Sequence, residues 1–162
     1  LITPVEEFFE EEGPSPLQRL YDKLLDGSQP VRIAFMGDSF VEGDILTADL
    51  REKLQETFGG GGVGFVPAAS PFTGFRQTVK TTSKGWTPYN IMQRKSVPDP
   101  YAGDFFVSGW VAAAADGAST RWDMTSRRRH LEECSRARLL FISRSPSQVS
   151  VCLLYTSPSP RD

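Results

Sequence analysis

A helix–strand–helix pattern in residues 17–58 limits the possible folds more than any other feature of the sequence. The first helix is predicted from a Ser15-Pro16 start signal, a Gly27 stop, and apolar side chains at helical spacing, namely Leu17, Leu20, Tyr21, Leu24 and Leu25. This spacing indicates that the first helix covers an apolar layer. The apolar residues 31–36 predict a buried strand, and residues 44–58 predict a second helix with its apolar side chains on one side. This order is typical of the start of an α/β layer.

Beyond Gly64 the sequence changes from helical periodicity to a β-type composition. Residues 65–151 are rich in Gly, Pro, Ser and Thr, with β-favouring runs at 75–82, 105–112 and 137–143. Only residues 125–134 favour a short helix there. We therefore expect an α/β fold with two parts, residues 1–64 in an α/β layer and residues 65–151 in a mostly antiparallel β module.

Composition excludes several classes of function. The chain has 162 residues, 39% of them hydrophobic, and a net charge of −2, so it can bury a core and is not a nucleic-acid binder driven by bulk charge. No apolar run approaches the roughly 20 residues that cross a bilayer. Two cysteines and one histidine make neither a disulfide framework nor a zinc site, so no metal or cofactor is expected.

The residues that are the best candidates for catalysis follow the predicted strand. Gly37 permits a sharp turn, Asp38 follows it, and Ser39 then lies at the carboxyl end of the strand, where open α/β sheets bind their ligands. A serine in this place can present its hydroxyl as a nucleophile and its own N–H to a developing oxyanion, provided that a base lies within reach.

This segment resembles block I of the SGNH/GDSL hydrolases. Residues 31–47 and 62–65 resemble the branch that contains O-acetylpeptidoglycan esterases, and the resemblance is clear for about residues 17–67. It implies an incomplete three-layer, flavodoxin-like fold. It also implies that Ser39 is the nucleophile and one oxyanion donor, that Asp38 orients the loop, and that Gly37 makes the turn.

The other catalytic blocks of that family are not found in this sequence. The family takes its base from an Asp-x-x-His, whereas His130 is preceded at that spacing by Arg127. Asn90 lacks the Gly-x-Asn context of a further oxyanion donor. The chain is therefore expected to be the N-terminal piece of a larger enzyme, unable to turn over alone because a serine without its base loses most of its nucleophilicity.

In the peptidoglycan-esterase branch a carbohydrate-binding module follows block I, and residues 65–151 start where such an insert would begin. Its aromatic rings are candidates for stacking on sugars. Trp86 and Tyr89 are the predicted substrate-binding residues, Trp86 as the more exposed ring and Trp110 as a buried one; the remaining candidates are Tyr101 and Trp122.

The resemblance implies a serine esterase that removes acetyl groups from a bacterial cell-wall or other polysaccharide, outside the cytoplasm in the periplasm or beyond. The expected partner is an acetylated glycan or another ester substrate, with no nucleic acid and no transmembrane segment. Two alternatives stay open. One is a non-catalytic carbohydrate-binding or cell-surface protein on the same scaffold, and the other is a polysaccharide O-acetyltransferase.

Two motifs are interpreted as structural. Residues 59–64 match Gly-x-Gly-x-x-Gly but follow a helix, so they predict a helix C-cap and a turn and not a dinucleotide site. The acidic residues Asp38, Glu42, Asp44 and Asp49 lack a calcium-type loop, and Asp44 is interpreted as an N-cap or loop-holding residue.

The natural N-terminus is expected to be missing, and the last eleven residues are expected to be artificial. The chain begins at Leu1 without Met, so the absence of a signal peptide carries no information on localisation. Residues 152–162 resemble the frame translation of a transposase-type sequencing adapter, the alternative being a Ser/Pro-rich linker.

A long read of the gene, free of library adapter, tests this expectation. We expect the codons after Val151 to differ from those of residues 152–162 and the frame to continue to an Asp-x-x-His. A frame that ends after Asp162 would contradict the expectation and favour a binding protein.

Overall fold

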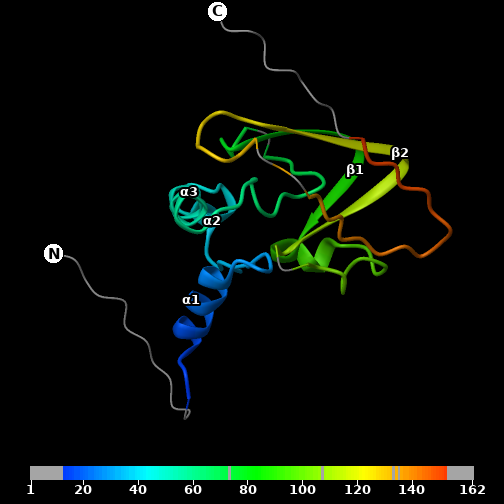
Figure 1. Cartoon of the computed structure of the whole chain (residues 1–162). Coiled ribbons are helices and arrows are strands. Elements are labelled where there is room, and N and C mark those ends of the chain that lie inside the picture. The colour runs from blue at the N-terminus through cyan, green and yellow to red at the C-terminus, as the bar shows by residue number, and fades with distance from the viewer. Residues whose placement is uncertain (1–12, 73, 107, 133, 135, 153–162) are drawn as a thin grey trace, which may run out of the picture.

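The computed structural model describes residues 13–72, 74–106, 108–132, 134 and 136–152. The helices are α1 (Pro16–Asp26), α2 (Ser39–Glu42), α3 (Thr47–Phe58) and the 3₁₀ helix η1 (Ile91–Ser96); the strands are β1 (Val79–Asn90) and β2 (Trp110–Met124). The two strands pair antiparallel (Figure 1). Helices followed by an antiparallel sheet agree with the expected mixture of α and β structure.

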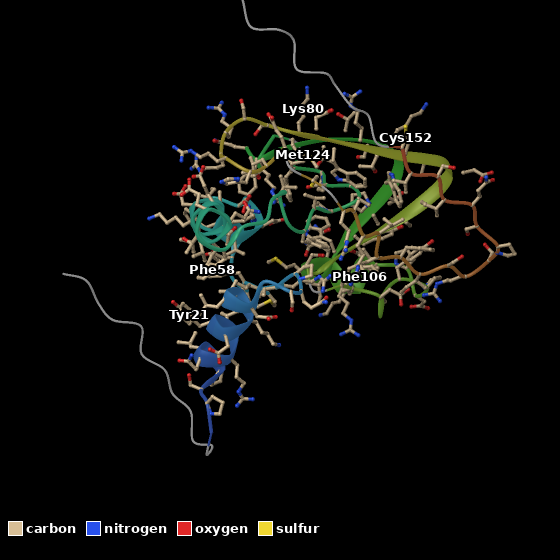
Figure 2. The ribbon with its side chains drawn as sticks, in the orientation of Figure 1. Tyr21, Phe58, Lys80, Phe106, Met124 and Cys152 are labelled. Atoms are coloured by element: carbon tan, nitrogen blue, oxygen red, sulfur yellow. The ribbon has the colours of Figure 1, made fainter. Side chains whose placement is uncertain are left out.

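Helix α1 forms where the sequence predicts it because both ends are capped. The Ser15 side chain accepts a hydrogen bond from the Gln18 N–H, and Gly27 closes the helix in a left-handed conformation (φ 61°). The expectation that α1 covers an apolar layer is wrong for the described chain, because the helix has no buried residue. Its apolar face touches the rest of the molecule at Tyr21, whose ring meets Phe58 of α3 edge-on at 6.1 Å (Figure 2).

The predicted buried strand at residues 31–36 is also wrong. These residues have no strand conformation, and Ile33, Phe35 and Met36 are exposed, Met36 by 71%. A strand requires a neighbour to satisfy its backbone N–H and C=O groups. Among the described residues the only strands are β1 and β2, and they pair with each other.

The sheet lies in the half of the chain that the composition indicated. Its register runs from Val79 opposite Met124 to Asn90 opposite Trp110, with a shift at Gly85 (φ 73°). A Cβ at Gly85 would lie 3.1 Å from the Ala118 backbone, so glycine permits this close approach. The strand expected at residues 137–143 is absent, and the described residues of 125–134 form turns instead of the expected helix.

A small core joins the sheet to the glycine-rich segment that follows α3. Val63, Val79 and Leu131 are buried against each other, with Val66, Trp122 and Met124 packed around them. In Figure 2 Met124 marks this end of the sheet, and Phe106 is labelled at the opposite end. The core thus draws on residues from both sides of the predicted boundary at residue 64, whose position stays a prediction.

Leu131 is the most buried side chain of this core, so Leu131→Ala is expected to lower the free energy of unfolding by about 2–4 kcal/mol through the cavity that it leaves. Urea titration measures this change. The matched control is Leu140→Ala, at a leucine that is 55% exposed, which is expected to change stability by less than about 0.5 kcal/mol. Equal losses in both variants would contradict the assignment of the core.

Candidate functional site

Ser39 is the first residue of α2 and is exposed to solvent. The Asp38 carboxylate caps this short helix by accepting a hydrogen bond from the Phe40 N–H at 3.0 Å. The Asp38 carbonyl accepts from the N–H groups of Val41 and Glu42. A Cβ at residue 37 would lie 2.5 Å from the Val41 side chain, so a larger residue there would have to displace Val41.

These contacts leave Ser39 with unused hydrogen-bonding groups. Among the described residues, neither its hydroxyl nor its backbone N–H has a hydrogen-bond partner, while its carbonyl accepts from the Gly43 N–H at 2.9 Å. The structure therefore presents a serine with a free hydroxyl and a free N–H. Its role as a nucleophile, and the roles of Asp38 and Gly37 in a reaction, stay predictions.

The turn after α2 is held by Asp44, a carboxylate that is only 3% exposed. Arg51 of α3 binds both of its oxygens, at 2.6 and 2.8 Å. Thr78, directly before β1, donates to Oδ2 at 2.7 Å, and Thr47 donates to Oδ1 at 2.5 Å. Asp44 thus joins α2, α3 and the sheet, which agrees with its interpretation as a loop-holding residue.

Arg76 adds a second cation to this cluster. Its guanidinium lies 3.2 Å from Asp44 Oδ2 and also donates to the carbonyls of Val63 and Phe65. Burial lowers the pKa of Arg76, and the charge of Asp44 opposes that effect. Because arginine stays charged in proteins, Arg76 contributes a fixed positive charge that pins the glycine-rich segment to the turn after α2.

The balance of burial and pairing decides the charge of Asp44. Burial alone would raise its pKa, but hydrogen bonds from Arg51, Thr47 and Thr78 and the charge of Arg76 lower the pKa from 3.8 to about 2. Asp44 is therefore a carboxylate at any physiological pH. It is occupied by two guanidinium groups, which makes it a structural anion and not a free acid or base.

A second contact joins the helix of Ser39 to the sheet. Trp110, the first residue of β2, donates its indole N–H to Glu42 Oε1 at 3.1 Å. Trp110 is half-buried, which differs from the expected full burial. Phe72 packs edge-on against it, with ring centroids 6.1 Å apart.

The predicted sugar-binding rings are engaged within the β half of the chain. Trp86 is half-buried, contrary to the expected exposed ring, and its indole N–H donates to the Ser119 carbonyl at 3.1 Å. Tyr89 stacks on Tyr101, with centroids 5.4 Å apart. Their role in binding a substrate stays a prediction.

His130 and Asn90, the two residues considered for the missing catalytic blocks, each take part in a hydrogen bond that shapes the backbone. The His130 carbonyl accepts from the Gly62 N–H, and the Asn90 side chain caps η1 by accepting from the Met92 N–H. That neither residue is part of the site stays a prediction.

The C-cap interpretation of the glycine-rich motif agrees with the structure at Gly59. No group of three or more His, Cys, Asp or Glu side chains in the part of the chain that the structure describes could hold a metal ion. Gly59 caps α3, its N–H donating to the Gln55 carbonyl at 2.9 Å. The arginines at 128 and 129 pair with Asp49 and Glu56 of α3, so they fasten the turn to that helix.

Comparisons with protein-family models, curated proteins and solved structures found no match to this chain. In the described part of the chain, no helix is long and apolar enough to span a membrane.

Acid unfolding tests the Asp44 cluster. Because the pKa of Asp44 is lower in the folded state, its stabilisation is complete above pH 4 and is lost as the pH falls toward 2, a loss of roughly 2 kcal/mol. Asp44→Asn keeps the shape but leaves two cations unpaired, so it is expected to cost about 2–4 kcal/mol at pH 6 and to reduce the dependence on pH between 4 and 2.

Urea titrations of both chains at several pH values measure these changes. The control is Asp116→Asn, at an exposed aspartate of β2, which is expected to leave stability unchanged at pH 6. An Asp44→Asn chain as stable as the wild type at pH 6 would contradict a structural role for the cluster.

Proposed function

We propose that the protein is a serine esterase of the SGNH/GDSL type and that Ser39 is its nucleophile. The observation that carries this proposal is the free hydroxyl and free backbone N–H of an exposed serine, fixed at the start of α2 by the Asp38 cap. The resemblance of residues 31–47 to block I supplies the reaction class.

In the proposed reaction the Ser39 hydroxyl attacks an ester carbonyl and passes its proton to a base. The carbonyl oxygen becomes an oxyanion, which the Ser39 N–H stabilises. Loss of the sugar alcohol leaves an acyl-serine, and attack by water releases acetate and restores the serine. The base is expected from an Asp-x-x-His further along the gene.

The exposed apolar residues 31–36 support the proposed three-layer fold. Three large apolar side chains in six residues, Ile33, Phe35 and Met36, are exposed directly before the turn that leads to Ser39. Exposure of such a run opposes solubility, and pairing as a strand in a covered sheet would remove it from water.

The proposed substrate is an acetylated polysaccharide of the bacterial cell wall, which places the enzyme outside the cytoplasm. The same acyl-serine could instead pass its acetyl group to a sugar hydroxyl. Product analysis separates esterase from transferase, because only the esterase releases acetate to water in the presence of a sugar acceptor.

The test uses the chain extended through its own gene to the Asp-x-x-His. We expect it to release acetate from O-acetylated peptidoglycan, and Ser39→Ala to lower kcat/KM by about 10³-fold or more. Mass spectrometry of the quenched reaction should find an acetyl group on the peptide that contains Ser39.

The control variant is Ser83→Ala, at an exposed serine of β1, which should keep full activity. The 162-residue chain is expected to show no turnover, because it lacks the base. Full activity in the extended Ser39→Ala chain would contradict the proposal.

A further inference from the structure

An aromatic pair lies beside the helix that carries Ser39. Trp110 donates its indole N–H to Glu42, and Glu42 follows Ser39 by three residues in α2. Residues at this spacing are neighbours on a helix, with Cβ atoms about 5–6 Å apart. The hydrogen bond therefore holds the indole ring next to the part of α2 from which Ser39 projects.

Phe72 packs edge-on against this indole ring. The planes of Phe72 and Trp110 meet at 81°, and Phe72 is 58% exposed. An exposed ring thus lies at nearly a right angle to the half-buried ring of Trp110. Most of the Phe72 side chain stays in contact with water in the folded chain, so its apolar surface adds little to stability. A bound apolar surface would remove it from water.

We propose that Trp110 and Phe72 form the subsite for the pyranose ring that bears the ester, with Glu42 as an acceptor for one of its hydroxyl groups. This inference rests on the proposed function and deepens it. Sugar C–H faces are apolar and pack on aromatic rings, while the sugar hydroxyls require polar partners at the edge of the site. The Glu42 carboxylate is exposed and has acceptor positions beyond the one used by Trp110.

The other candidate rings are held elsewhere. Trp86 bonds to Ser119 across the sheet, and Tyr89 covers one face of Tyr101. Among the described residues, these two side chains have no hydrogen bond or ring contact with α2. Of these rings, Trp110 is the one that is hydrogen-bonded to α2, and Phe72 packs against it, which favours these two for the ring subsite.

Titration of the 162-residue chain with the N-acetylglucosamine tetramer, a neutral pyranose oligomer, tests the subsite by NMR. The indole N–H resonance of Trp110, assigned through Trp110→Phe, is expected to shift in a saturable way at millimolar ligand. Phe72→Ala should weaken binding about fivefold, because it removes an exposed ring that the fold does not need.

The matched control is Phe141→Ala, because Phe141 has the same ring at 59% exposure and should leave the affinity within about twofold. Trp110→Phe keeps a flat ring but loses the bond to Glu42, so weaker binding is expected there as well. A Trp110 resonance that does not move, equal affinity of Phe72→Ala and the wild type, or a shift confined to the Trp86 indole would each overturn the proposal.

Ser39→Ala distinguishes the two proposals. Its chain should bind the tetramer as the wild type does, because the subsite contains no atom of Ser39. Binding that depends on Phe72, together with an extended chain that hydrolyses no ester, would support the subsite and refute the esterase. Ester hydrolysis without any binding at Trp110 would support the esterase and refute the subsite.

Discussion

The paired charges around Asp44 hold the molecule together. The carboxylate is bound by Arg51 from α3, by Arg76 from the segment before β1, and by Thr78 at the start of the sheet. Removing a carboxylate from water is costly unless cations and donors replace the lost hydration, and here both do so. The described chain buries few apolar side chains, so the relative positions of its elements depend strongly on this polar cluster.

The cluster also determines where Ser39 lies relative to the sheet. Asp44 ties the turn after α2 to the beginning of β1, and Glu42 ties α2 itself to the beginning of β2. Since β1 and β2 are antiparallel, these two contacts reach opposite ends of the sheet. The helix that carries Ser39 is therefore fastened at two points, which favours a fixed position of its backbone relative to the sheet.

The candidate site could be predicted only in part. The Gly37-Asp38-Ser39 turn was visible because a glycine and a serine after an apolar run are local signals, and the Asp38 cap is a contact between residues two positions apart. Arg76 carried no such signal: it lies 32 positions from Asp44, within a run that predicts a strand. Trp110 was expected to be buried, because its apolar neighbours give no indication of the Glu42 carboxylate that reaches its indole.

The sequence by itself determined those elements whose partners are local. Helix α1 has Ser15 and Gly27 at its ends, and α3 ends at Gly59, because caps are bonds within one turn of the chain. Tertiary structure decided the rest. Residues 31–36 have the composition of a strand, but in the described part of the chain no strand lies beside them, and residues 79–90 form one because residues 110–124 supply its hydrogen bonds. A strand is completed by a distant segment, so its composition alone does not determine whether it forms.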